Sequence, residues 1–307
     1  MGDWLALLSA GCFAASNVTI TRGVGANGQD NGAFLSILLT AGISGALWLG
    51  QGAEQGWPAP HPLGALWFAG AGILTIFVGR VFSYASIQHL GAVRASVAKR
   101  LIPLFSILLA VLLLGESFDL AMLLGMLLIG SGFVVLILQA LKARVAERGG
   151  GSEGRPSWAS SLGSLGFYYG PVSALAYAFG YIARKEGLTL MPDPAFGTML
   201  GSVVGGLVSV LVAQFVPSYR TALRQTFRAF NPLLLAAGVL STAGQLFYFA
   251  ALSHSTISRV AMISSIEAFL TILFSVMVAR SFKQLNGPVL LAAALGVAGT
   301  VLLMVHR

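Results

Sequence analysis

Charged residues are scarce in this sequence. Lys, Arg, Asp and Glu together make up 9% of its 307 residues, whereas hydrophobic residues make up 56%. The mean hydropathy is +0.84. One soluble core cannot bury this much apolar surface, so the composition excludes an ordinary soluble domain and predicts a protein that uses lipid as its solvent.

Cysteine is scarcer still, since Cys12 is the only one. A single thiol forms neither a disulfide nor a cysteine metal site within one chain. The sequence also lacks the HExxH, GxSxG, phosphate-loop and zinc-ligand patterns, and it has no helical pair of carboxylates typical of membrane proteases. We therefore expect no enzymatic activity, no cofactor and no metal.

The net charge of +8 raises the question of a nucleic-acid partner. The basic residues sit at the ends of apolar segments or inside them, and no long basic tail is present. This distribution is typical of a membrane protein, so we expect no nucleic-acid binding.

Apolar residues are grouped in blocks of about 20, the length that a helix needs to cross a bilayer. Backbone groups in lipid must pair within the segment, so each block is predicted to be a helix. The first block has Asp3 where a signal peptide carries basic residues, and we interpret it as a retained helix. The ten predicted helices are Trp4–Thr21, Ala33–Leu49, Leu66–Ile87, Val93–Leu114, Leu120–Leu141, Leu162–Ile182, Phe196–Val216, Pro232–Leu252, Ile257–Ala279 and Pro288–Val305.

A polar linker at 142–161 separates two similar halves, 1–141 and 162–307. An odd number of helices in each half turns the second half upside down relative to the first, as in many secondary transporters. The predicted fold is an all-α membrane protein with ten transmembrane helices in two inverted five-helix repeats. At a shift of about 165, the matching residues are Phe82, Ala85, His89 and Arg94 in the first half and Phe247, Ala250, His254 and Arg259 in the second.

The run PLFSILLAVLLLGESF (Pro103–Phe118), followed by LLGMLLIGSGFVVL, resembles the end of an EamA-type repeat in the drug/metabolite transporter superfamily. The second half departs from this pattern, with Ala268 at the place of Pro103 and ARSF at the place of GESF. The resemblance implies ten helices and a central cavity lined by helices 1, 3, 4, 6, 8 and 9. It also implies export or exchange of small metabolites.

Four ionisable residues lie well inside predicted helices: Arg80, Lys99, Arg100 and Glu267. Such residues are costly in a membrane, so each is expected to be functional. The alternative is that Glu267 neutralises one cation in a packed bundle while the other cations extend to the interface.

The repeat adds a second argument for these positions. Arg80 aligns with Gln245, and Lys99 and Arg100 align with Ser264 and Ser265. Both halves are therefore polar at these three positions, but only the first half is charged there. The resulting positive excess favours a carboxylate or phosphate group on the substrate. A zwitterion could instead place its ammonium at Glu267.

Aromatic and amide residues are expected to complete the pocket. These residues are spaced three or four positions from another polar or aromatic residue of the same predicted helix, and residues at that spacing lie on one helical face. For the tyrosines the alternative is an interfacial belt, and for Asn17 it is a bond between helices. These residues are Tyr84, Tyr177, Tyr181, Gln245, Tyr248 and Asn17.

Other polar residues and the glycines have predicted roles outside the pocket. Arg94 and Arg259 are expected to contact lipid phosphate or to gate the cavity mouth. Glu116 is expected to stabilise the N-terminus of the helix that starts at Leu120. Pro103 should bend its helix beside Lys99. The residues Gly197, Gly201 and Gly205 form GxxxG steps that predict a close approach to another helix of the same chain.

The sequence therefore predicts a secondary active transporter, an exporter or exchanger of a small polar metabolite with an anionic group, working by alternating access. The alternatives are a flippase for a phosphorylated lipid carrier and a non-transporting membrane scaffold. Expected partners are the small-molecule substrate, the lipid bilayer and a coupling proton or counter-substrate, for a monomer or homodimer. We expect a multi-pass protein of the bacterial inner membrane.

Two arguments about orientation disagree. The loop arginines and lysines place the linker and the segment between helices 7 and 8 in the cytoplasm, with the termini outside. The family resemblance implies cytoplasmic termini, so the orientation stays open.

Overall fold

The computed structural model describes residues 1–24, 32–57, 59, 61–79, 82, 101–116, 119–148, 165–228, 231–279 and 287–305. Their regular structure is helical throughout, without a strand, and it follows the predicted order of ten spans. The all-α, ten-helix prediction is confirmed. The spans are α1 (Gly2–Val24), α2 (Ala33–Gln55), α3 (Pro62–Gly72) with the π-helix η1 (Ile73–Gly79), α6 (Leu101–Leu114), α7 (Leu120–Arg148), α9 (Leu165–Leu190), α10 (Pro194–Phe215), α12 (Pro232–His254), α13 (Ile257–Ser264) with α14 (Glu267–Ala279), and α15 (Gly287–Val305).

Two elements differ from the prediction. The segment between α10 and α12 forms an additional helix, α11 (Pro217–Arg228). The predicted helix 257–279 is interrupted, because the amide of Ile266 donates to the carbonyl of Ile263 at 3.2 Å, three residues back instead of four. Neither Gly nor Pro marks this break, so hydropathy alone showed one continuous helix.

Two helices continue beyond their predicted ends. α7 passes Leu141 and ends at Arg148, and α9 passes Ile182 and ends at Leu190. Hydropathy detects the apolar part of a helix, whereas polar turns that stay helical at its end carry no such signal.

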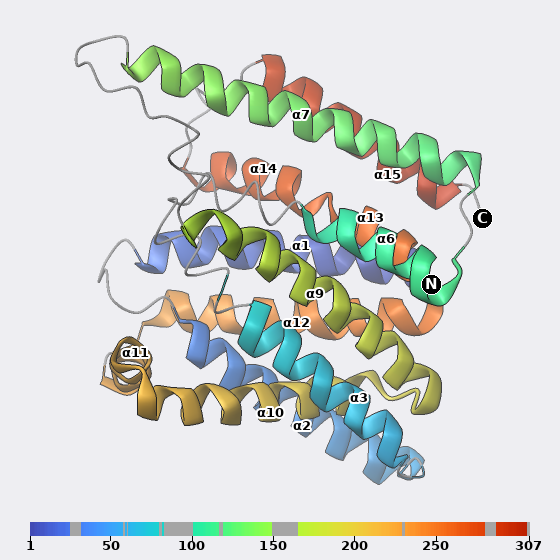
Figure 1. Cartoon of the computed structure of the whole chain (residues 1–307), viewed down its shortest axis with the longest axis vertical. Helices are drawn as coiled ribbons and strands as arrows, with labels where there is room; N and C mark the ends of the chain where they lie inside the picture. The colour runs from blue at the N-terminus through green and yellow to red at the C-terminus, as the bar shows by residue number, and fades with distance from the viewer. Residues whose placement is uncertain are drawn as a thin grey trace.

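The two halves run in opposite directions through the bundle (Figure 1). Gly2 at the start of α1 packs against Ser255, just after α12, and Lys185 near the end of α9 donates to the carbonyl of Leu252 at 2.6 Å. The first helix of one half therefore begins where the first helix of the other half ends. The end of the bundle where α1 begins and α9 ends also holds both chain termini, and we call it the terminal end. The opposite end, where α7 ends and α9 begins, is the linker end.

Glycines allow a very close contact between the halves at the crossing of α3 with α10. A Cβ atom at Gly72 would collide with the carbonyl oxygen of Gly201. Gly197 lies against Phe68 and Gly205 against Ile76 in the same way. The predicted close approach to a helix of the same chain is confirmed.

Large apolar side chains lie on both the inside and the outside of the bundle. Phe68, Phe249 and Ile263 are fully buried and belong to one apolar core cluster. Leu112 and Leu127, in contrast, are 68% and 58% exposed on outer faces. Exposed apolar surface on this scale fits contact with lipid. Within the described ranges, six helical segments are long and apolar enough to cross a membrane: Gly2–Ile20, Ala33–Glu54, Pro62–Gly79, Pro194–Phe215, Pro232–His254 and Ile257–Val278.

Candidate functional site

A buried arginine in α9 forms the centre of a polar and aromatic cluster between the halves. Arg184 is 5% exposed. Its Nη2 atom donates to Thr75 Oγ1 of η1 at 3.0 Å and to Gln245 Oε1 of α12 at 3.4 Å. Its guanidinium carbon lies 4.4 Å from the ring centre of Phe249 and 5.6 Å from that of Tyr181. Such aromatic contacts stabilise a cation that is held away from water.

Helical spacing places the α9 residues of this cluster on one face of that helix, and Thr75 of η1 contacts this face. Tyr177, Tyr181 and Arg184 follow the i, i+4, i+7 spacing of one face of α9. Thr75 comes from the π-helix η1, a deviation that is frequent at functional sites. The hydroxyl of Thr75 donates to the carbonyl of Ala71 at 2.8 Å, so its oxygen is available to accept from the arginine.

The tyrosines complete this cluster. The rings of Tyr181 and Tyr248 have centres 4.6 Å apart, and Tyr177 lies 6.3 Å from Tyr181. Tyr248 Oη is buried and has no hydrogen-bond partner among the described residues. An unsatisfied buried hydroxyl costs free energy, and a bound ligand can satisfy it. The structure thus brings the predicted residues Tyr177, Tyr181, Gln245 and Tyr248 together around Arg184.

A second polar contact joins the halves through an acid. Asn17 Nδ2 of α1 donates to Glu267 Oε1 at 2.7 Å. Glu267 is the first residue of α14, directly after the helix break, where the N-terminal dipole favours a carboxylate. Glu267 is also close enough to Tyr181 to interact with it electrostatically. The guanidinium of Arg184 and the carboxylate of Glu267 therefore both lie near Tyr181.

The two predicted serines lie at the break between α13 and α14. Ser264 Oγ is buried and forms no hydrogen bond within the described ranges. Ser265 Oγ donates to the carbonyl of Met262 at 2.5 Å, so this hydroxyl is used within the turn. Of these two serines, Ser264 is the one with an unsatisfied hydroxyl.

Four predicted site residues lie outside the described residues: Arg80, Tyr84, Lys99 and Arg100. Their roles stay predictions, as does the bend at Pro103, because the structure describes its helix only from Leu101 onward.

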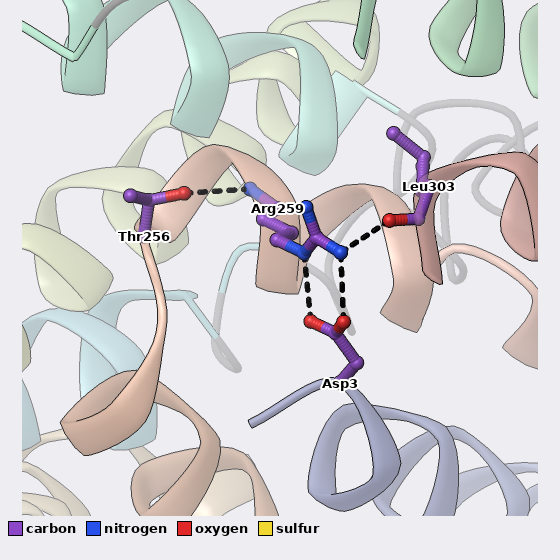
Figure 2. A network of polar contacts seen from close by, with 4 residues as sticks. All are labelled: Asp3, Thr256, Arg259 and Leu303. Carbon is purple, nitrogen blue, oxygen red and sulfur yellow. Dashed lines mark hydrogen bonds and ion pairs between the residues drawn. The ribbon is translucent and has the colours of Figure 1, made fainter. Parts of the chain in front are cut away.

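Charged contacts between the halves fasten the terminal end. Figure 2 shows Asp3 of α1 holding Arg259 of α13 with both carboxylate oxygens, at 2.8 Å to Nε and 2.8 Å to Nη2. Arg259 also donates to the carbonyl of Leu303 in α15. Glu116 accepts from the amides of Ile257 at 2.7 Å and Ser258 at 3.0 Å. The described part of the terminal end is therefore closed by contacts from both halves.

These contacts correct two predictions. Arg259 was expected to contact lipid phosphate or gate the cavity mouth. It binds Asp3 and a backbone carbonyl within the bundle, which corrects the lipid-phosphate alternative, and the gating role stays a prediction. Glu116 was expected to stabilise the helix that starts at Leu120, but it caps α13 in the other half. Asp119 caps the helix at Leu120 instead, by accepting from the amide of Met122 at 2.6 Å.

The residue that sequence reasoning missed is Arg184. The predicted helix ends at Ile182, which places Arg184 in a loop and outside the predicted set of intramembrane cations. The available signal was spacing, because Arg184 continues the face defined by Tyr177 and Tyr181. Among the described residues, no three His, Cys, Asp or Glu side chains are grouped as a metal site.

Comparisons with known proteins place the chain in a family. The model of the EamA-like transporter family matches residues 1–138 and 164–305. A solved crystal structure is similar over 97% of this chain and 94% of its own, with a TM-score of 0.65 and 20% sequence identity, which supports the fold alone. No curated protein matches the sequence. Because the family model covers nearly the whole chain, this protein belongs to the EamA-like transporter family, whose members are ten-helix membrane transporters of small molecules.

Proposed function

We propose that this protein is a secondary active transporter that exports or exchanges a small polar metabolite bearing an anionic group. Organic anions, amino acids and phosphorylated metabolites fit this class. The protein would work by alternating access in the bacterial inner membrane, as a monomer or homodimer, and would couple transport to a proton or a counter-substrate.

The observation that carries this proposal is the position of Arg184. Arginine stays charged even when buried, and its planar fork pairs with carboxylate or phosphate through two parallel hydrogen bonds. Thr75 and Gln245 orient the guanidinium from opposite halves, at 3.0 and 3.4 Å. A substrate anion bound here would contact both halves, as alternating access requires.

The remaining residues set the other properties of the substrate. Tyr181 and Tyr248 offer ring faces and the unsatisfied Tyr248 hydroxyl to the body of the ligand. Glu267 and Asn17 would bind an ammonium group, or exchange the coupling proton. The predicted cations Arg80, Lys99 and Arg100 would strengthen the preference for anions.

Movement between states would begin at the terminal end. Opening this end separates Asp3 from Arg259 and Glu116 from the start of α13, because these pairs join the two halves. The break between α13 and α14 lies between this network and Glu267, so a change at Glu267 can be transmitted to the closed end.

Ligand-induced stabilisation of the purified protein tests this proposal. Matched pairs of small carboxylates and their neutral amides are added, and the unfolding temperature is measured. We expect carboxylates to raise the unfolding temperature of the native protein and amides to leave it unchanged. Arg184→Gln should lose the difference, whereas Arg22→Gln, an exposed arginine at the linker end, should keep it. Equal effects of acids and amides would refute the preference for anions.

A further inference from the structure

The helix α11 is oriented differently from the spans. Figure 1 shows α11 end-on, while the helices of the bundle lie across the view. The preceding helix α10 has 22 residues, enough to cross the hydrocarbon core, and it ends at Phe215. α11 starts two residues later, so it lies across the linker end at the level of the membrane surface.

The two faces of α11 differ in polarity. Arg220, Arg224 and Arg228 recur every four residues and therefore lie along one face. The described side chains of Arg220 and Arg224 are exposed, whereas those of Leu223 and Thr226 are half-buried. No Asp or Glu occurs anywhere in 216–231. The outer face of α11 is therefore positively charged without a local acid to neutralise it.

Exposed aromatic rings flank this basic face. Phe215 is 84% exposed and Phe227 is 69% exposed. The ring of Phe227 contacts Phe34 of α2 edge-on, with centres 6.2 Å apart, which leaves most of its surface uncovered. Arginines beside aromatic rings on a short amphipathic helix are the composition of helices that lie in the lipid interface.

The two described arginines have different contacts. Arg220 Nε donates to the carbonyl of Ala213 at 3.3 Å, and Nη2 bonds the carbonyl of Gln214, so this side chain fastens α11 to the end of α10. Arg224 makes no hydrogen bond or ion pair with any residue that the structure describes, and it is exposed. Phosphate is the group that an exposed arginine fork binds best at a membrane surface.

We propose that α11 is an interfacial helix that binds the headgroup phosphates of anionic phospholipids through its arginine-bearing face, on which Arg224 is exposed. Phe215 and Phe227 insert at the boundary between headgroups and acyl chains. Arg220 keeps the helix in register with α10. This lipid site is separate from the Arg184 region and does not depend on the proposed substrate.

The test is lipid binding by the purified full-length protein, measured by native mass spectrometry during titration with phosphatidylglycerol or phosphatidylcholine. The test variant is Arg224→Gln/Arg228→Gln. We expect the native protein to prefer phosphatidylglycerol and the double variant to bind it about 25-fold more weakly, or roughly fivefold for each arginine. The charge-preserving Arg224→Lys/Arg228→Lys variant should retain most of the preference.

Controls separate this site from other effects. Thr221→Gln changes an exposed residue on the same helix and should bind phosphatidylglycerol as the native protein does. The double variant should unfold at the native temperature in lipid-free detergent, because Arg224 holds no described residue in place. Unchanged phosphatidylglycerol binding in the double variant would refute the proposal. So would displacement of the lipid by millimolar inorganic phosphate, which would indicate a site for free phosphate.

Depth in the membrane gives an independent readout. Phe227→Trp places a fluorophore on α11, and phospholipids brominated near the headgroup should quench its emission more than lipids brominated at the chain ends. Quenching by neither lipid would overturn the interfacial position.

Discussion

At the scale of single residues, the proposed preference for anions rests on Arg184. Charged hydrogen bonds contribute about 1.5–3 kcal/mol, so Arg184→Gln should weaken anion binding roughly 10- to 150-fold. Arg184→Lys keeps the positive charge but loses the planar guanidinium fork. Its affinity for the anion should lie between those of the native protein and Arg184→Gln. Isothermal titration with the best carboxylate from the stabilisation screen measures this order. Equal affinities for Arg184→Lys and Arg184→Gln would show that charge does not contribute.

A second residue prediction concerns Glu116, whose carboxylate accepts two amides at the start of α13. Glu116→Ala removes this cap and should destabilise the protein by about 1–2 kcal/mol. Glu54→Ala, an exposed change near the end of α2, should leave stability within about 0.5 kcal/mol. Thermal unfolding of both variants decides whether the cap stabilises the contact between the halves.

Part of the candidate site could be predicted from the sequence. Polarity and spacing predicted Gln245, Tyr248, Tyr177 and Tyr181, and the structure places all four together. Arg184 was missed because the hydropathy boundary came too early. Pairs such as Asp3 with Arg259 join residues from opposite halves, and no local pattern encodes such a contact.

At the scale of elements, the crossing of α3 and α10 is set by glycine. Gly72→Ala would place a methyl group against the backbone of Gly201 and should cost about 1–3 kcal/mol or more through overpacking. Gly70→Ala, two residues earlier in the same helix, meets no atom within 4 Å and should be neutral or stabilising. Unfolding temperatures of the pair measure the difference, and equal values would contradict the observed crossing.

Hydropathy predicted the membrane spans but neither α11 nor the break between α13 and α14. Apolar blocks gave the ten spans, because lipid imposes a minimum length on each of them. α11 was missed because its average composition is polar and only its periodicity indicates a helix. Neither Gly nor Pro marks the break after Ser264, so composition and hydropathy give no signal for it. The repeat boundary at 142–161 stays a prediction.

At the scale of the whole molecule, the terminal-end network should control access between the halves. Asp3→Asn weakens the pair with Arg259 and should speed amide exchange in α13 about fivefold to tenfold. The swap Asp3→Arg/Arg259→Asp restores an ion pair and should recover part of the protection. Hydrogen–deuterium exchange of residues 257–264 follows both variants. Native protection in Asp3→Asn would mean that the pair does not hold the closed end.

The central claim is that this transporter carries a small anion past Arg184. The most direct test is counterflow in proteoliposomes, in which uptake of a labelled carboxylate is driven by unlabelled carboxylate, amide or amine inside. We predict saturable uptake driven by the carboxylate, absent with the neutral amide and abolished by Arg184→Gln. Equal uptake driven by the amine, or native uptake by Arg184→Gln, would contradict the account.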